Sequence, residues 1–270
     1  MGDRRRGNTV YRRVYGLVDR KRLLEERWPT YLQFDPVFHR ELQQVPVDRV
    51  IRHYVPSACL RELNIQRTLD AVQACAVELV DELKAATSLP DRSFGISGSV
   101  LVGLHSDSSD IDPVVYGREA SIRVREALET LLNGHGCFLR YDAKSIEILY
   151  ESRSMSGSMS LRDFARHERR KVFEGKYRGR DYFVRCVKEW DETSEKYGDR
   201  QFYPEGRSSI AAVICDASES ILTPCRYEIR NVKVTDGPRE KVPSSIVSFR
   251  GRFCEQAFEG ERISARGELE

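Results

Sequence analysis

The sequence predicts an α+β protein with an N-terminal segment of short elements, a core of helices and short strands, and a small C-terminal β domain. Two amphipathic patterns with helical spacing, at 64–87 and 119–132, predict the core helices. Short apolar runs bounded by glycine and aspartate predict strands between and after them. Four runs with β-type alternation follow residue 207 with little helical pattern between them. The length of 270 residues suffices for one large domain or two small ones.

Four parts are expected along the chain. Residues 1–63 carry a basic arm and are interrupted by prolines, so they should form short elements wrapped on a larger body. Residues 64–188 form the core, 189–207 a polar, turn-rich linker, and 208–270 a small β-barrel-like domain.

The expected elements of the core alternate between helix and strand. "SFGISGSVLVGLH" predicts a short strand, a Gly-Ser corner and a short helix, and "DIDPVVYG" a strand that begins at the aspartates. The remaining core predictions are a helix over Asn64–Thr87, a helix over Glu119–Leu132, a strand in "CFLRYD", a basic helix over 160–173, and a strand over 180–188. In the C-terminal part the four predicted strands lie in "SSIAAVICDA", "ILTPCRYEIRNVKV", "SSIVSFRGRF" and "ERISARGELE".

The net charge of +2 hides two basic segments. Residues 1–24 hold eight basic and two acidic residues, and residues 161–188 hold ten basic and four acidic residues. Such segments favour a polyanionic partner such as RNA, whereas a solvated charged face is the alternative explanation.

The seven cysteines are widely spaced and contain no Cys-x-x-Cys, which argues against a zinc ribbon and a disulfide scaffold. They are predicted to be small core residues in a reducing, cytoplasmic setting. No apolar run approaches the roughly 20 residues of a membrane span, so no membrane partner is expected. The sequence also contains neither a P-loop motif nor a Gly-x-Ser-x-Gly elbow.

The stretch from Gly98 to Asp112 is the strongest candidate site. Asp110 and Asp112 stand at i and i+2, so on a strand both carboxylates point to one face while Ile111 points into the core. Paired carboxylates suit Mg²⁺, and phosphoryl transfer uses such ions to clamp the reacting oxygens. Gly98 permits close approach to a phosphate, and Ser99 offers a hydroxyl. The spacing therefore predicts a phosphate-binding corner beside a metal-binding pair.

These residues resemble the signature of the polymerase-β-like nucleotidyltransferase superfamily, in which an apolar residue and Gly-Ser precede Asp-x-Asp after about ten residues. More narrowly, the chain resembles a little-characterised archaeal group of nucleotidyltransferases, through stretches such as "RWPTYLQFDPVF", "VPVDRVIRHYVP" and "VSFRGRFCEQAFEGE" scattered from about residue 10. The resemblance implies a core with a mixed sheet and flanking helices. It also implies transfer of a nucleoside monophosphate from an NTP to a hydroxyl, with Mg²⁺ or Mn²⁺ as cofactor.

By this resemblance Gly98 and Ser99 bind the nucleotide phosphates, and Asp110 and Asp112 bind the metal, with Asp112 as the bridge between two ions. A cation at Arg185 or Lys188 is expected to contact the nucleotide phosphates. Because these two residues face opposite sides of a strand, at most one of them points to the site.

The chain departs from the family pattern at two points. Pro113 follows Asp112 and removes a ladder donor, which an edge strand tolerates but which predicts a bulge in a central strand. Catalytic members carry a third carboxylate on a neighbouring strand. The candidates are Asp181, Glu147 and Asp142, of which Asp181 is favoured; the alternative for Asp181 is an ion pair with a nearby arginine.

Outside this stretch, Arg250, Arg252 and Phe253 in "SFRGRF" fit either an RNA-contacting strand or a plain barrel strand. His105 fits either a ligand contact or a loop histidine. The leading hypothesis is a metal-dependent nucleotidyltransferase whose acceptor is RNA rather than a small molecule. The alternatives are a catalytically inactive nucleotidyltransferase fold that binds RNA or nucleotide, and an accessory protein whose β domain recruits a partner.

Overall fold

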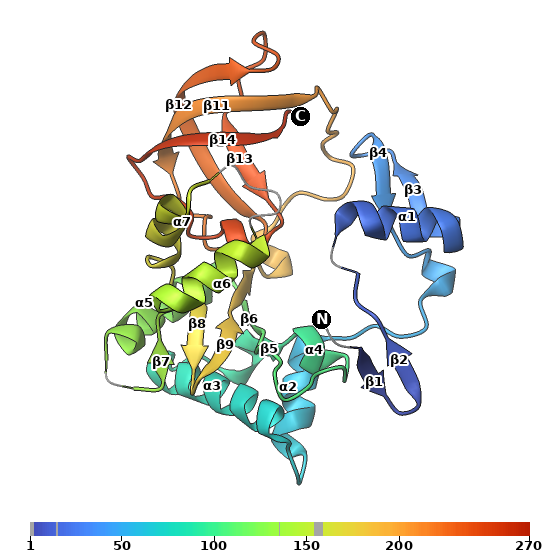
Figure 1. Cartoon of the computed structure of the whole chain (residues 1–270), viewed down its shortest axis with the longest axis vertical. Coiled ribbons are helices and arrows are strands. Elements are labelled where there is room, and N and C mark those ends of the chain that lie inside the picture. Colours follow the sequence, from blue (N-terminus) through green and yellow to red (C-terminus); the bar gives the residue numbers. More distant parts are fainter. Residues whose placement is uncertain (1–2, 15, 135, 154–158) are drawn as a thin grey trace.

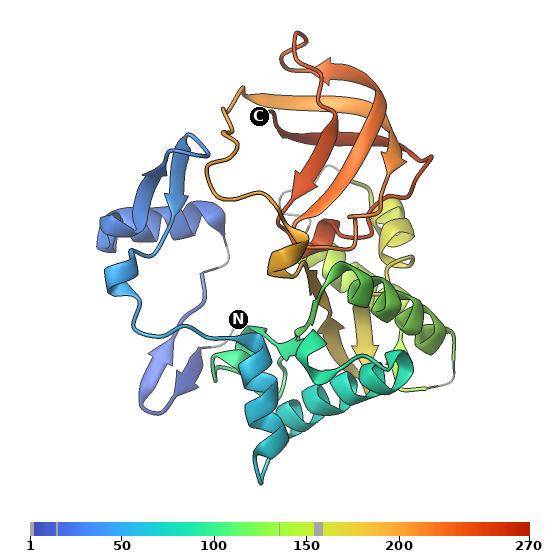
Figure 2. The same ribbon diagram turned by 180° about the vertical axis from the view of Figure 1, so that it is seen from behind.

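The computed structural model describes residues 3–14, 16–134, 136–153 and 159–270. It is a mixed α+β structure with several small sheets and a half-barrel sheet at its C-terminal end (Figures 1 and 2). This agrees with the predicted class.

The N-terminal segment consists of short elements, as its prolines predicted. They are the hairpin of β1 (Arg4–Arg6) and β2 (Thr9–Tyr11), helix α1 (Leu17–Arg27), and the hairpin of β3 (Leu32–Asp35) and β4 (Arg40–Gln43). Helix α1 buries none of its residues, so contacts outside it must hold the segment in place. The linker supplies some of them: Phe202 N donates to Val37 O at 2.7 Å, and the Tyr197 hydroxyl donates to Asp35 at 3.1 Å.

The predicted helix over 64–87 is wrong in its N-terminal part, because two helices meet there. Helix α2 (Pro56–Ile65) ends before helix α3 (Ala71–Thr87) begins. The boundary is a capping box: the Asp70 carboxylate accepts from the amides of Val72 and Gln73, and the Gln73 side chain accepts from the amide of Asp70. This reciprocal pairing satisfies donors that would otherwise be orphaned at a helix start.

A three-stranded sheet carries the candidate site. It contains β5 (Phe94–Ile96), β6 (Pro113–Tyr116) and β10 (Arg185–Val187) in the order β10-β6-β5, with β5 antiparallel and β10 parallel to the central β6. The short helix α4 (Gly98–Leu101) follows β5, and helix α5 (Arg118–Asn133) follows β6 (Figure 1). These elements match the predicted strand, corner and helix.

A second sheet in the order β7-β8-β9 adjoins the first. Its strands are β7 (Phe138–Leu139), β8 (Glu174–Tyr177) and β9 (Arg180–Phe183). The bridge between Ile111 and Tyr182 joins β9 to the segment before β6. The helices beside this sheet are α6 (Ala143–Arg153) and α7 (Leu161–Glu168). The predicted basic helix over 160–173 therefore ends at Glu168, and "KSIEILY" is helical rather than part of a strand.

The C-terminal sheet has the antiparallel order β13-β12-β11-β14. Its strands are β11 (Arg207–Asp216), β12 (Cys225–Asp236), β13 (Ser245–Ser248) and β14 (Arg262–Glu268). All four predicted strands are present, and the sheet buries its own apolar cluster, which includes Ile210, Ile214 and Tyr227. The strand predicted in "SSIVSFRGRF" ends at Ser248, and 251–253 is instead the 3₁₀ turn η6.

A buried ion cluster joins the core to the C-terminal part. The Lys171 ammonium donates to Glu168, Glu174 and the backbone oxygen of Arg252, each at 2.8 Å, and its side chain is 1% exposed. Arg153 contacts both glutamates, at 3.3 Å and 2.7 Å. Lys171 and Arg153 lower the pKa of Glu174 against the effect of its burial, whereas burial and the neighbouring Glu174 carboxylate raise the pKa of Glu168.

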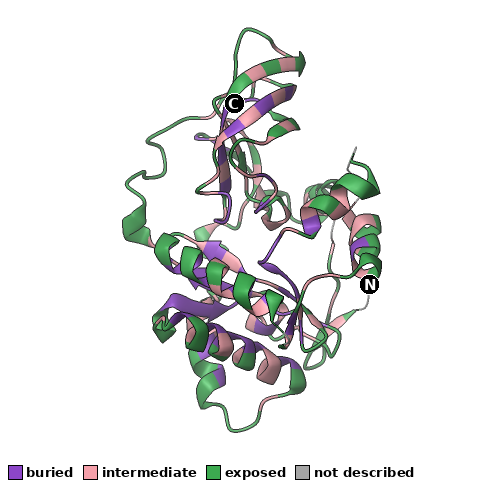
Figure 3. Cartoon of the chain, turned by 90° about the vertical axis from the view of Figure 1, so that its left-hand side faces the viewer, coloured by how far each residue is buried: buried purple, intermediate pink, exposed green. Residues whose placement is uncertain are grey.

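A second contact of this kind uses Glu255, whose buried carboxylate accepts from the amides of Val172 and Phe173 at 3.0 Å. Arg125 on α5 pairs with the same carboxylate at 3.3 Å. Figure 3 shows buried residues continuing from the core strands into the C-terminal sheet.

Replacing Lys171 by Met should destabilise the protein by about 3–5 kcal/mol, because it leaves two buried carboxylates with Arg153 as their one cationic partner in the cluster. The measurement is the free energy of unfolding in urea at pH 7. The control is Lys241→Met, which breaks an exposed pair with Glu205 and should cost at most about 1 kcal/mol. Equal losses in the two variants would contradict this role of Lys171.

Candidate functional site

Gly98 and Asp112 are in direct contact. Gly98 has φ +64°, and a Cβ added to it would overlap the Asp112 carboxylate. Backbone pairing fixes this contact, because Ser97 N donates to Asp112 O at 2.8 Å and the Ser97 hydroxyl donates to the same oxygen at 3.0 Å. The Gly-Ser corner therefore lies against the Asp-x-Asp pair, as the spacing predicted.

The two aspartates repel each other's charge. Burial and the neighbouring Asp110 carboxylate raise the pKa of Asp112 to about 6, against the opposing effect of Arg185 and Arg13. A partly buried carboxylate that is costly to ionise is a frequent mark of a functional site, where a bound cation removes the cost.

Strands β9 and β10 follow one another beside the aspartates with the same parallel register. Ile111 N donates to Asp181 O, and Phe183 N donates to Ile111 O, both at 2.9 Å. Ile111 and Tyr182 are both buried, so by alternation Asp181, Phe183 and Arg185 lie on the same side of the sheet as the two aspartates. The structure thus brings four predicted residues to one face: Asp110, Asp112, Asp181 and Arg185.

Asp181 nevertheless has a partner of its own, because Lys176 pairs with its carboxylate at 2.8 Å. Of the other two candidates for the third carboxylate, Asp142 directly precedes α6 and Glu147 lies on it. Asp142 accepts from the amide of Ser145 at 2.7 Å at the start of this helix, and Glu147 is exposed on it. Of the three candidates, only Asp181 lies on a strand that adjoins the aspartates.

Pro113 lies in the central strand, and the predicted bulge is absent. Ile111 pairs with Tyr182 and Val114 pairs with Arg185, so both strands advance by the same number of residues between these pairs. The ladder is instead interrupted at Val184, between β9 and β10. Val184 lies opposite Pro113, which has no N–H to donate. The missing donor thus costs one ladder bond and leaves the strand in register.

Ser99 and His105 flank the corner. The Ser99 hydroxyl oxygen is buried and has no hydrogen-bond partner within the described residues. A buried hydroxyl without a partner, next to Gly98, can donate a hydrogen bond to an oxygen-rich ligand. His105 pairs with Asp70 at 2.7 Å and so ties the loop after α4 to the start of α3.

Two arginines of the N-terminal hairpin hold this loop, a role that the sequence reasoning missed. Arg4 donates to Leu104 O at 3.0 Å and to the Ser109 hydroxyl at 2.7 Å, and Arg6 donates to Val102 O at 3.3 Å. Arg180 donates to Ser109 O at 2.8 Å from the other side. Charge density marked both basic segments, but no sequence signal showed that these cations bind loop carbonyls.

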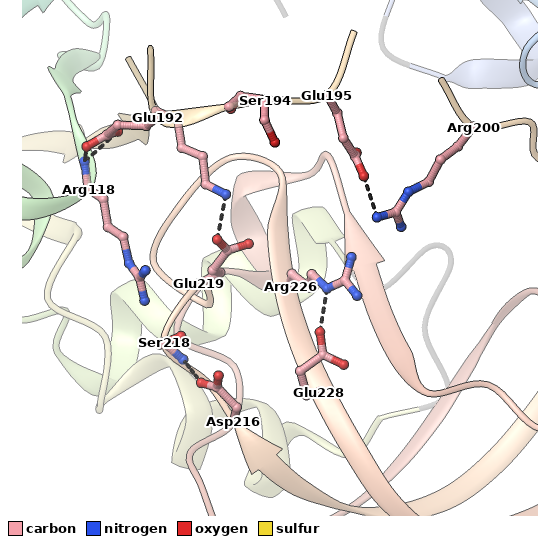
Figure 4. A pocket seen from close by; sticks show the side chains of 12 residues that line it. Arg118, Glu192, Ser194, Glu195, Arg200, Asp216, Ser218, Glu219, Arg226 and Glu228 are labelled. Carbon is pink, nitrogen blue, oxygen red and sulfur yellow. Dashed lines mark hydrogen bonds and ion pairs between the residues drawn. The ribbon is translucent and has the colours of Figure 1, made fainter. Parts of the chain in front are cut away.

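Lys188 lies apart from the aspartates. It pairs with Glu219 in the pocket of about 490 Å³ shown in Figure 4, between the start of α5, the linker and strands β11 and β12. The register pairs Tyr116 with Val187, so Lys188 lies beyond the end of β6 farthest from Asp112. Arg185 is therefore the cation of the two that lies by the site.

Other cations of segment 161–188 also have internal partners. Arg170 pairs with Glu261, Lys176 with Asp181, and Arg178 with Glu78 on α3. Much of the positive charge in this segment is therefore neutralised within the fold.

Within the described part of the chain, no group of three or more His, Cys, Asp or Glu side chains is arranged to hold a metal ion. Two carboxylates still fit Mg²⁺, which proteins commonly bind through one or two carboxylates together with substrate phosphates and water. The raised pKa of Asp112 and the position of its carboxylate against Gly98, beside Asp110, are consistent with a cation held by the two carboxylates.

Comparison with known proteins yields no match to a family model and none to a solved structure. Over 252 residues the chain is 29% identical to an uncharacterised protein of Methanocaldococcus jannaschii, an alignment that covers 92% of this chain and 71% of that protein. Over 93 residues, 34% of the chain, it is 36% identical to phosphoribosylaminoimidazole-succinocarboxamide synthases of Xanthomonas euvesicatoria and Xanthomonas axonopodis. It spans only 29% and 28% of these synthases.

Across the described residues, no helix is both long and apolar enough to cross a membrane.

Replacing Asp112 by Asn should stabilise the metal-free protein at neutral pH. The folded-state pKa of Asp112 is raised from 3.8 to about 6, so the wild type loses stability as the pH rises from about 4 to 6. A shift of this size corresponds to about 2–3 kcal/mol. In EDTA, urea unfolding should therefore show a gain for Asp112→Asn at pH 7 that disappears near pH 4. The exposed variant Asp107→Asn should show no such pH-dependent gain.

Replacing Gly98 by Ala should displace the Asp112 carboxylate. A non-glycine residue at φ +64° costs about 1–2 kcal/mol, and the added methyl group would also overlap the carboxylate. The control is Gly103→Ala, which has the same φ of +64° but meets only Arg6 Cδ, at 3.8 Å. Mg²⁺ should raise the melting temperature of the wild type and of Gly103→Ala but not that of Gly98→Ala. Loss of this increase in both variants would contradict the role of the Gly98–Asp112 contact.

Proposed function

We propose that this chain is a metal-dependent nucleotidyltransferase with a polymerase-β-like core, which moves a nucleoside monophosphate from an NTP to a hydroxyl acceptor on RNA. The main support is the contact between Gly98 and the Asp112 carboxylate, with Asp110 on the same face. This contact brings a corner suited to phosphate and two carboxylates suited to a divalent cation into one site.

In this proposal the acceptor hydroxyl forms a new bond to the α-phosphorus, and the bond between the α-phosphorus and the β-bridging oxygen breaks. Pyrophosphate leaves with the electron pair, and the hydroxyl proton is released. Gly98 lets the Asp112 carboxylate lie against the backbone of the corner, and the Ser99 hydroxyl, which has no partner among the described residues, donates to a phosphate oxygen. Arg185 supplies positive charge beside Asp112.

Asp110 and Asp112 would hold Mg²⁺ or Mn²⁺. Such ions neutralise the triphosphate and stabilise the charge that develops on the attacking and leaving oxygens. Asp181 contributes its carboxylate once Lys176 turns from it toward the anionic substrate.

A second candidate function is nucleotide or RNA binding without catalysis. The ion pair of Lys176 with Asp181 favours it, as does the lack of a three-carboxylate cluster within the described residues. The two functions differ in one observable, which is the release of pyrophosphate.

The test is incubation of the purified protein with Mg²⁺, each α-labelled NTP in turn, and bulk archaeal RNA. The wild type should transfer label to RNA and release pyrophosphate. Asp110→Asn and Asp112→Asn should each lose at least about 100-fold, because loss of a metal ligand removes several kcal/mol of transition-state stabilisation. The control Asp107→Asn removes a charge from the same loop and should keep wild-type activity.

Asp181→Asn separates the two candidate functions. A loss comparable to that of Asp110→Asn, with unchanged NTP affinity, supports catalysis by three carboxylates. If the wild type binds NTP but releases no pyrophosphate with any nucleotide, the transferase proposal is wrong and the binding function is supported.

A further inference from the structure

The loop at 249–253 combines exposed aromatic rings with arginines. Phe249 is 68% and Phe253 39% exposed, and Arg250 is exposed between them. Nε of Arg252 is buried without a hydrogen-bond partner, and neither arginine pairs with an acidic side chain, among the residues that the structure describes. Arginines without a carboxylate partner, interleaved with exposed phenylalanines, are typical of surfaces that bind single-stranded nucleic acid.

The fold places this loop beside the candidate site, although it belongs to the C-terminal part of the chain. Gly251 packs on the ring of Phe183 so closely that a Cβ at this position would overlap the ring. Phe183 lies next to Asp112 in the parallel register and on the same face, and the Arg185 guanidinium lies 5.4 Å from the centre of the same ring. Figures 1 and 2 show the red segment that contains η6 between the C-terminal sheet and the core strands.

The loop and the phosphate-binding corner lie on opposite sides of the aspartates. The Gly98 corner follows β5 on one side of β6, whereas Phe183 and Arg185 belong to the strands on the other side. With the nucleotide phosphates at Gly98, the side that carries Phe183 and the loop remains open to the second substrate.

We propose that the loop 249–253, together with Arg185, is the binding site for the acceptor strand, a single-stranded nucleic acid. Arg185, Arg250 and Arg252 contact its phosphates, and Phe249 and Phe253 stack on its bases. The role of this strand as acceptor rests on the proposed transferase function, whereas its binding to the loop does not. Contacts of this kind recognise the charge of the phosphates and the faces of the bases, so RNA and DNA strands should bind with similar affinity.

The test is fluorescence anisotropy in EDTA with a labelled, unstructured 12-nucleotide RNA and a DNA of the same sequence. The wild type should bind both. Arg250→Gln/Arg252→Gln should weaken binding at least tenfold. It should also lower the slope of log affinity against log salt by about 1.4, because each lost contact to a single strand removes about 0.7. Phe249→Leu/Phe253→Leu should weaken binding at least fivefold and leave the salt slope unchanged.

The matched control is Arg230→Gln/Lys233→Gln, which removes the same charge from exposed positions farther along β12. This variant should bind RNA within twofold of the wild type, and all variants should keep wild-type urea midpoints. Failure of the wild type to bind either strand would overturn the inference, as would equal weakening by the control. The inference would also be overturned if both loop variants bound the strands as tightly as the wild type does.

The inference and the proposed function can fail separately. Transfer activity with an unchanged KM for RNA in Arg250→Gln/Arg252→Gln would refute the loop as the acceptor site and leave the transferase function standing. Strand binding that depends on the loop in a wild type without transfer activity would keep the binding site and refute the transferase function.

Discussion

The candidate site depends on the contact between the Asp112 carboxylate and the backbone of Gly98. Only a residue without a Cβ fits there, and the backbone at Gly98 has a φ of +64°, which favours glycine. The hydrogen bonds from Ser97 to Asp112 O hold the two segments together. The Gly-Ser corner and the carboxylate pair thereby become one structural unit, which neither segment forms alone.

The rest of the fold supports this unit from two sides. The N-terminal arginines Arg4 and Arg6 bind the loop between the corner and the aspartates. On the other side, the strand of Tyr182 and Phe183 continues the sheet, with Tyr182 in the core and Phe183 on the face of the site. One strand therefore links core packing to the site, and through Gly251 to the C-terminal part of the chain.

Several cations of the two basic segments are engaged within the fold. The sequence shows two basic segments, but cations within them bind loop carbonyls or pair with glutamates such as Glu78 and Glu261. The arginines without acidic partners within the described residues include Arg250 and Arg252, which lie outside both segments. Whether a cation is available to a ligand depends on long-range pairing, which local composition does not encode.

By itself, the sequence determined the features that depend on local periodicity and spacing. The Gly-Ser corner, the strand after Asp112, helix α5 and the four C-terminal strands all follow from patterns within short windows. The boundary at Asp70, a capping box in the structure, was not predicted, because an apolar stripe that runs past it favoured one continuous helix. The tertiary structure alone decided that Asp181 lies beside Asp110 with Lys176 as its partner, that Lys188 lies elsewhere, and that Phe183 joins the loop of Gly251 to the site. These relations arise from strand register and side-chain packing between segments far apart in the chain, and no local pattern specifies them.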